Sequence, residues 1–169
     1  MMLTKVYSAA ISGIDAIVVT IETAVRKGTL FSIVGLADTA VKEAYTRITT
    51  ALMQSGIGFP HKSTVINLSP ADVKKEGAAF DLPMAIGVLA ANEKVPGEHL
   101  SEYMIMGELS LDGSVLPVKG VLPMAVKARE MGFRRLIVPE ANVTEAAIVN
   151  KVEVFGVRDI ADAVNVIAG

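Results

Sequence analysis

Hydrophobic residues along the chain change from one spacing to another, and the change separates strands from helices. Near the amino terminus, two runs, residues 6–11 and 16–25, are rich in apolar and β-branched residues, with Ser12 and Gly13 between them. Two such runs on either side of a short polar turn are typical of an antiparallel strand pair. A third short strand is expected at residues 30–34.

Apolar residues then recur at helical spacing over residues 40–52, which predicts one amphipathic helix. Asp38 stands where it can cap the amino end of this helix, and Gly56 stands where it can end it. Glu43 and Arg47 are four residues apart with the acid first, the favourable order for an ion pair on an exposed helix face.

Strands and helices alternate through the rest of the chain. The spacing predicts strands at residues 63–68, 103–111, 114–118, 135–138 and 152–157, and helices at residues 82–91, 121–131, 142–148 and 160–167. Residues 112–113 are expected to form a tight hairpin turn, and residues 74–77 a polar loop. Antiparallel strands followed by βα units predict a mixed fold, α/β or α+β in class.

Length and composition exclude several kinds of protein. The 169 residues suffice for one domain, residues 1–169. The chain has no Cys, which excludes disulfides and thiolate metal sites. Its net charge of -2 does not favour a protein built chiefly to hold nucleic acid. No apolar run is long enough to span a membrane, and the start does not resemble a signal peptide. We therefore expect a cytoplasmic protein.

Two stretches resemble a known family. Residues 31–91 contain VGLADTAV and KEGAAFDLP, and residues 107–142 begin GELSLDGSVLPVKG. Both resemble the amino-terminal domain of the ComM/YifB family of magnesium-chelatase-like (ChlI-like) AAA+ ATPases. The second also resembles the proteolytic domain of Lon. The resemblance implies a Lon-protease-like fold of the ribosomal protein S5 domain 2 type.

The resemblance also implies what lies outside this chain. Family members carry an AAA+ module after this domain, so ATP and Mg²⁺ are expected for the full-length protein, together with a homo-oligomer, a hexamer by family pattern. For ComM the family implies a motor acting on branched DNA during natural transformation. This chain itself has no G-x-x-x-x-G-K-[ST] string, so we expect no cofactor within it.

Lon-type proteolysis uses a Ser nucleophile that a nearby Lys activates. By the resemblance, the Ser position is Ala79, in the loop that begins at Lys75, and the Lys position is Met124. A methyl group cannot attack a carbonyl, and a thioether cannot serve as a base. The sequence therefore predicts a non-catalytic accessory or assembly domain.

Two other functions remain open. One is a degenerate peptidase with shifted residues, for which Ser63, Ser69, Lys119 and Lys127 are the candidates. The other is a stand-alone DNA-binding module.

Possible binding residues are few. His61 and His99 are isolated in sequence and are interpreted as surface residues rather than metal ligands. Glu76 and Asp81 could together hold Mg²⁺, although Asp81 is better interpreted as the cap of the helix that follows it.

Basic doublets occur at residues 26–27, 74–75 and 134–135. They could touch nucleic-acid phosphates if the fold brings them together. Contacts to nucleic acid or to a protein partner are predicted at Lys74, Lys75, Arg134 and Arg135. The partners expected are the protein's own ATPase module, further copies of the chain and DNA, with no membrane.

Overall fold

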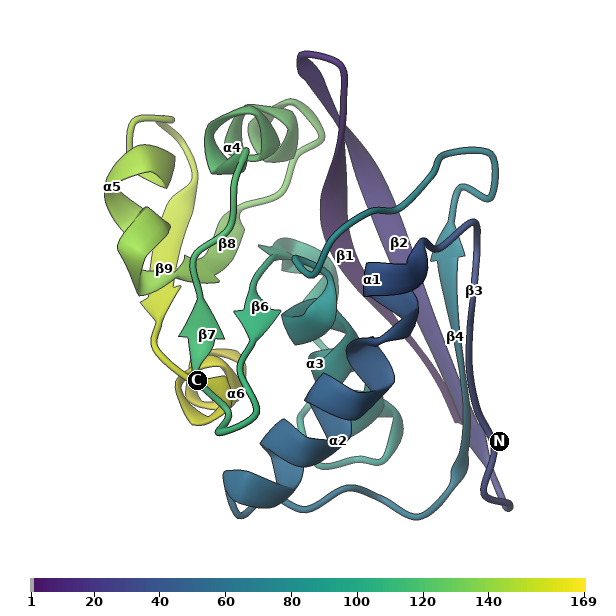
Figure 1. The fold of residues 1–169 in the computed structure, drawn as a ribbon. Helices are drawn as coiled ribbons and strands as arrows, with labels where there is room; N and C mark the ends of the chain where they lie inside the picture. Colours follow the sequence, from purple (N-terminus) through teal and green to yellow (C-terminus); the bar gives the residue numbers. More distant parts are fainter. Residues whose placement is uncertain (1) are drawn as a thin grey trace.

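A seven-stranded sheet runs through the computed structural model, which describes residues 2–169 (Figure 1). Its strands, in spatial order, are β3 (Phe31–Val34), β4 (Ser63–Ser69), β2 (Asp15–Arg26), β1 (Met2–Ser12), β5 (Tyr103–Ile105), β8 (Arg135–Pro139) and β9 (Glu153–Val157). Only β2 runs against the other six, because it pairs antiparallel with both β1 and β4 while the remaining neighbours are parallel. The predicted mixed α/β class is confirmed, and the layout is consistent with a Lon-like fold.

Helices cover the two faces of the sheet. One apolar core joins the sheet to α1 (Thr39–Lys42), α2 (Ala44–Gln54), α3 (Asp81–Ala91) and α6 (Ile160–Ala168). A second core joins it to α4 (Val121–Glu130) and α5 (Val143–Ala146). Short 3₁₀ turns stand at Leu100–Glu102 and Glu140–Asn142. No helix within residues 2–169 is long and apolar enough to cross a membrane.

The central helix is α3, which packs on β1 and β2 and is covered by α2 (Figure 1). All of its residues are buried, as its nearly uniform apolar sequence requires. Gly87 allows the close approach, because a Cβ at this position would stand 2.7 Å from Oγ1 of Thr23. A larger residue here would push the helix off the sheet.

The single helix predicted at residues 40–52 is divided in two at Glu43. The guanidinium of Arg47 supplies a physical reason. Its Nη2 donates to the carbonyl of Ala40 at 2.7 Å, the acceptor that a continuous helix would use for the N–H of Ala44. The predicted cap is confirmed, because the Asp38 carboxylate accepts from the N–H of Val41 at 2.8 Å.

The strand predicted at residues 103–111 is also divided. Beyond β5, the chain leaves the large sheet at Gly107 and forms a separate hairpin from β6 (Glu108–Leu109) and β7 (Val115–Leu116). The N–H of Gly107 donates to Ala79, and its carbonyl accepts from Leu82, both at 3.0 Å. These bonds to the start of α3 replace those to a neighbouring strand, so the hairpin stands against the loop before α3.

Candidate functional site

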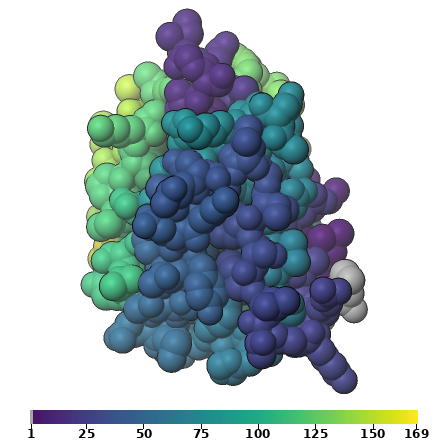
Figure 2. Space-filling model, turned by 45° about the vertical axis from the view of Figure 1, so that its right-hand side comes forward, coloured from purple at the N-terminus to yellow at the C-terminus, as the bar shows by residue number. Residues whose placement is uncertain are grey.

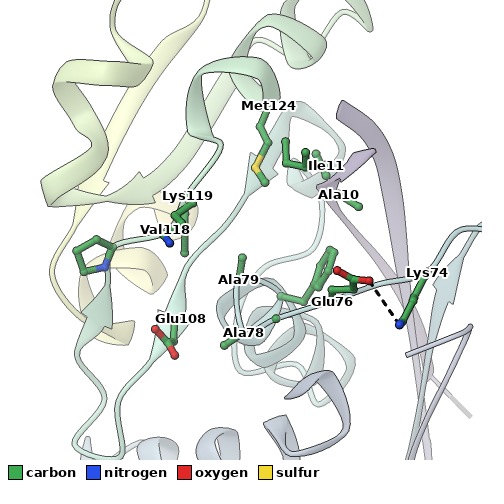
Figure 3. Close-up of a pocket in the computed structure, with 14 residues that line it drawn as sticks. Ala10, Ile11, Lys74, Glu76, Ala78, Ala79, Glu108, Val118, Lys119 and Met124 are labelled. Carbon is green, nitrogen blue, oxygen red and sulfur yellow. Dashed lines mark ion pairs between the residues drawn. The ribbon is translucent and has the colours of Figure 1, made fainter. Parts of the chain in front are cut away.

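A surface cavity of about 410 Å³ lies between the end of β1, the loop before α3, the β6–β7 hairpin and the start of α4 (Figure 3). Ala79 and Met124 both line it, and in Figure 3 they approach it from opposite sides. The structure therefore brings together the two positions that the sequence matched to a Ser-Lys dyad, although they are far apart along the chain.

The cavity wall offers little chemistry. Among the described residues, its lining contains no Ser, Thr, Cys or His. Its polar residues are Lys74, Glu76, Glu108 and Lys119, and Lys74 is already paired with Glu76 at 3.5 Å (Figure 3). A base could come from Lys119, but no hydroxyl or thiol stands in the lining for it to activate.

The other residues proposed for a shifted dyad are elsewhere. Ser63 and Ser69 lie on β4, and neither lines the cavity. Lys127 lies on α4 and forms an ion pair with Glu130 at 3.3 Å. The structure does not bring a Ser together with a Lys at this cavity.

The loop that carries Ala79 is anchored by Lys75, and here the prediction of a surface contact is wrong. The side chain of Lys75 is completely buried, and its Nζ donates to the carbonyl of Gly35 at 2.6 Å and to that of Pro70. Burial lowers the pKa of this amine, while the charge of Asp72 acts in the opposite direction. The residue closes a loop against the end of β3 and cannot reach a DNA phosphate.

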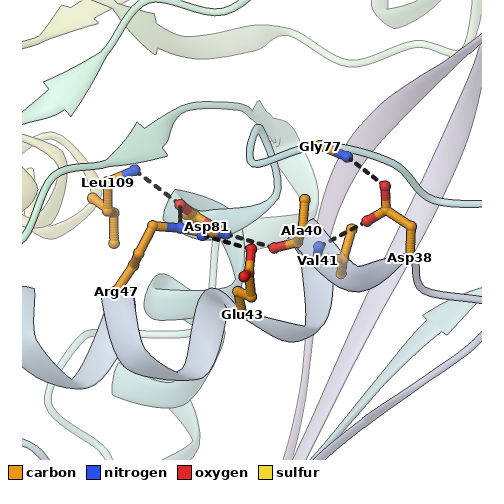
Figure 4. A network of polar contacts seen from close by, with 8 residues as sticks. All are labelled: Asp38, Ala40, Val41, Glu43, Arg47, Gly77, Asp81 and Leu109. Atoms are coloured by element: carbon orange, nitrogen blue, oxygen red, sulfur yellow. Dashed lines mark hydrogen bonds and ion pairs between the residues drawn. The ribbon is translucent and has the colours of Figure 1, made fainter.

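Backbone bonds hold the same loop to the residues before α1. The N–H of Lys75 donates to Leu36, and its carbonyl accepts from Asp38, both at 3.0 Å. The Asp38 carboxylate also accepts from the N–H of Gly77 at 3.3 Å (Figure 4). One side chain thus caps α1 and fixes the turn that leads to Ala79.

A buried ion pair holds the other side of the site. Asp81 is completely buried and accepts from Nε and Nη2 of Arg47, at 2.6 and 3.0 Å (Figure 4). It also accepts from the N–H of Leu109 at 3.1 Å. Burial raises the pKa of the Asp81 carboxyl, and the two donors oppose that shift. The network joins α2, α3 and β6 at one point.

Two predictions about these residues are corrected by this geometry. Asp81 does not cap α3, because it is the first helical residue and the capping position is Phe80. Nor does it pair with Glu76 around a cation, because its oxygens face Arg47 and Leu109. The predicted ion pair between Glu43 and Arg47 is present, at 4.0 Å. Within residues 2–169 no group of three or more His, Cys, Asp or Glu could hold a metal ion.

The basic doublets at residues 74–75 and 134–135 are not brought together. Lys74 follows the end of β4 and Arg134 precedes the start of β8, so on two strands of the same direction they lie at opposite ends of the sheet. Arg135 is paired with Glu153 at 3.4 Å, and its guanidinium lies 5.6 Å from the ring centre of Tyr103. Of the four residues predicted as contacts, only Arg134 is exposed with no ion pair inside residues 2–169.

Sequence reasoning missed part of the cavity wall. Ala9, Ala10 and Ile11 line it from the end of β1, and Glu108 lines it from the hairpin. The small residues in β1 carried no chemical signal. Glu108 belongs to the string that resembles Lon, which was the one clue to its position.

Comparison with known proteins agrees with this geometry. Residues 21–142 match the family model described as subunit ChlI of Mg-chelatase. Competence protein ComM of Haemophilus influenzae is 39% identical over 170 residues, covering 100% of this chain and 33% of ComM. YifB of Escherichia coli is 40% identical over 151 residues, covering 89% of this chain and 30% of YifB.

The similarity to Lon is weaker and shorter. An archaeal Lon protease of Thermoplasma acidophilum is 35% identical over 95 residues, covering 54% of this chain and 14% of that protein. The chain spans about a third of the length of its ComM and YifB relatives. Because the family model matches well over half of the chain, and ComM and YifB align along nearly all of it, the chain belongs to the ChlI family of Mg-chelatase-like proteins, with ComM and YifB as homologues.

Proposed function

We propose that this chain is a non-catalytic accessory domain of a ComM/YifB-like, magnesium-chelatase-like AAA+ ATPase. The observation that supports this most directly is the cavity in which Ala79 and Met124 meet. Both positions that would carry a Ser-Lys dyad hold apolar side chains, and neither can exchange a proton or form a covalent bond to a substrate.

The rest of the machine is inferred from the relatives. ComM and YifB are about three times as long as this chain, and we propose that the remaining length includes the ATPase module. ATP and Mg²⁺ would bind there, and the assembly would be a hexamer in the cytoplasm. We further propose that the assembly is a motor that processes DNA, including branch migration. One relative is named a competence protein.

The cavity wall is suited to a structural role in such an assembly. Buried contacts of Lys75 and the Arg47–Asp81 pair fix its loop to the helices and to the β6–β7 hairpin. A site held on several sides presents a constant shape, which suits the docking of a neighbouring module.

A second candidate, a peptidase with shifted residues, has one observation in its favour. Lys119 lines the cavity and could act as a base if a hydroxyl group were supplied beside it.

Hydrolysis of a fluorogenic peptide library tests both candidates, with an active Lon protease as the positive control. We expect no turnover by this chain or by the full-length ATPase. Turnover that a serine-directed electrophile stops, and that Lys119→Ala abolishes, would show that the domain is a peptidase.

The accessory role needs a test of its own. Deleting residues 1–169 from the full-length protein is expected to leave basal ATP hydrolysis in place and to reduce DNA stimulation or ring assembly, measured by phosphate release and by mass photometry. A deletion with no effect on either measurement would remove the accessory role.

A further inference from the structure

Two hollows adjoin each other where β2 ends and β4 begins. The first, of about 470 Å³, lies between the loop after β2, α2 and residues 58–62. The second, of about 490 Å³, lies between the end of β2, Lys62 and the residues that follow α3. Lys62 lines both, so the two hollows lie on either side of this residue. Figure 2 shows part of this face, with α2 and the loop after it in blue and the loop before β3 in indigo.

A partly exposed aromatic cluster lies at the first hollow. Tyr45 and Phe59 line it, and Tyr45 is 45% exposed. Phe31 packs behind, with its ring centre 4.6 Å from that of Tyr45, and Phe59 meets Tyr45 edge-on at 6.3 Å and 87°. Neighbouring rings hold Tyr45 in place while leaving much of it open to solvent.

Three cations lie along these hollows: Lys62 lines both, and Arg26 and Lys27 line the second. Arg26, Lys27 and Lys62 are exposed, and within residues 2–169 none of them forms an ion pair. The strand register explains their proximity. Arg26 lies opposite Ser63 in the β2–β4 pair, so Lys27 comes directly after β2 at the point where Lys62 comes directly before β4. Glu93 is the one acid among the residues that line either hollow.

The rings and the cations offer two different interactions, stacking and charge, at neighbouring places on the surface. The rings offer an apolar face on which a planar group can stack. The cations offer charge without a built-in counter-ion, next to that face and not within it. A ligand that matches both must carry flat aromatic groups joined by repeated negative charges.

We propose that this basic-aromatic surface, made by Arg26, Lys27, Lys62, Tyr45 and Phe59, binds single-stranded nucleic acid. The proposal rests on the proposed function in one respect, since a motor that processes DNA would bring a single strand to this domain. A base stacks on Tyr45 and the neighbouring phosphates lie against Lys62 and Lys27. Stacking on an exposed ring beside free cations is how proteins bind single strands without reading their sequence.

An acidic peptide fits less well, because its carboxylates would use the cations and leave the aromatic face unused. A duplex also fits less well, because its bases are already stacked on one another and cannot lie on Tyr45. The doublets at residues 74–75 and 134–135 lack this combination, since Lys74, Lys75 and Arg135 already have protein partners.

Fluorescence anisotropy of a fluorescein-labelled oligothymidylate strand, titrated with the 169-residue chain at several salt concentrations, tests the charges. The logarithm of affinity is expected to fall linearly with the logarithm of salt concentration. Each phosphate contact contributes about 0.7 to that slope for a single strand. Lys27→Gln with Lys62→Gln should therefore reduce the slope by about 1.4. Arg129→Gln with Arg134→Gln removes the same charge near α4 and should leave it unchanged.

The ring is tested separately. Tyr45→Leu should weaken oligothymidylate binding by roughly 5- to 150-fold, the range expected for the loss of one stacked base, without changing the salt slope. Tyr45→Phe keeps the ring and should bind like the wild type. Thermal unfolding followed by circular dichroism verifies that each variant is folded.

Three results would overturn the proposal. The first is an anisotropy that does not change on titration at about 50 mM salt, where electrostatic contacts are strong. The second is an equal loss of salt slope in the Arg129→Gln, Arg134→Gln control. The third is displacement of the strand by a polyglutamate peptide of matched length at equal concentration. The peptidase assay on the same chain separates the two ideas. If the chain neither binds oligothymidylate nor cleaves peptide, the nucleic-acid proposal is wrong and the accessory role is retained. If the chain binds oligothymidylate and also cleaves peptide, the non-catalytic accessory role alone is wrong.

Discussion

Replacing Arg47 with Ala is expected to destabilise the protein, because it removes the charged partner of Asp81. Asp81 is completely buried and keeps only the N–H of Leu109 as a donor once the guanidinium is gone. Removing one partner of a buried ion pair typically costs about 3–5 kcal/mol, because the remaining charge is left without compensation. Since the Arg47 side chain is 20% exposed, we expect the lower end, about 3 kcal/mol.

The opposite change is expected to cost less. Asp81→Asn keeps the shape and the bond from Leu109, and it leaves a guanidinium that still reaches water and Glu43. A lost charge-assisted hydrogen bond of this kind is worth about 1.5–3 kcal/mol. The structure therefore predicts an asymmetry, in which Arg47→Ala is more damaging than Asp81→Asn.

Urea unfolding at several pH values measures this asymmetry, and the direction in which it changes with pH is a further test. The pKa of Asp81 is raised in the folded state, so its contribution to stability is largest below the unfolded pKa and is lost as pH rises through the folded pKa. Removing Arg47 raises that pKa further. The stability gap between wild type and Arg47→Ala should narrow as pH falls from neutral into this window. A gap below about 1 kcal/mol at neutral pH, or one that widens on acidification, would refute the reasoning.

Three further changes probe the site. Lys75→Met leaves two carbonyls unbonded and should lower the free energy of unfolding by about 1–3 kcal/mol. Because the pKa of Lys75 is lowered in the folded state, the stability of the wild type should rise relative to this variant as pH rises toward about 10. Ala79→Ser combined with Met124→Lys should introduce reactivity toward a serine-directed electrophile, read by intact mass. Gly35→Ala should cost more than about 2 kcal/mol, since its Cβ would stand 2.1 Å from the carbonyl oxygen of Leu68. Gly56 also has a positive φ, but nothing lies within 4 Å of its Cβ position, so Gly56→Ala should cost about 1–2 kcal/mol.

These measurements have simple controls. Reactivity of the double variant should disappear in Ala79→Ser alone, because the base is then missing. A pH-independent difference between wild type and Lys75→Met would show that the amine is charged equally in both states. Equal costs for the two glycine variants, measured by thermal unfolding, would mean that the approach of Leu68 is not what requires glycine at position 35.

Elements with regular spacing could be predicted from the sequence, and long-range polar contacts could not. The β1–β2 pair and α3 follow from local patterns of apolar residues, which can be recognised within each segment alone. The breaks at Glu43 and Gly107 depend on partners distant in sequence, such as the carbonyl of Ala79 and the guanidinium of Arg47. No spacing rule contains those partners.

Polarity misled the interpretation of the site for the same reason. Lys75 was expected on the surface because it stands in a charged loop, but the carbonyls of Gly35 and Pro70 complete its hydrogen bonding inside the protein. Asp81 looked like a helix cap because it begins a helix. Arg47, 34 residues away, uses it instead. The positions of Ala79 and Met124 were found because long strings of residues carried the resemblance.

The complete burial of α3 has a consequence for how the protein opens. A helix with one face in water exchanges its amide hydrogens through local fraying, but every residue from Asp81 to Ala91 is enclosed by the sheet and by neighbouring helices. Its backbone can meet solvent only when the two sides of the core separate. Hydrogen exchange along the interior of α3 should therefore proceed at one slow rate, with an opening free energy equal to that of global unfolding. Exchange from this helix alone would then report the stability of the whole domain.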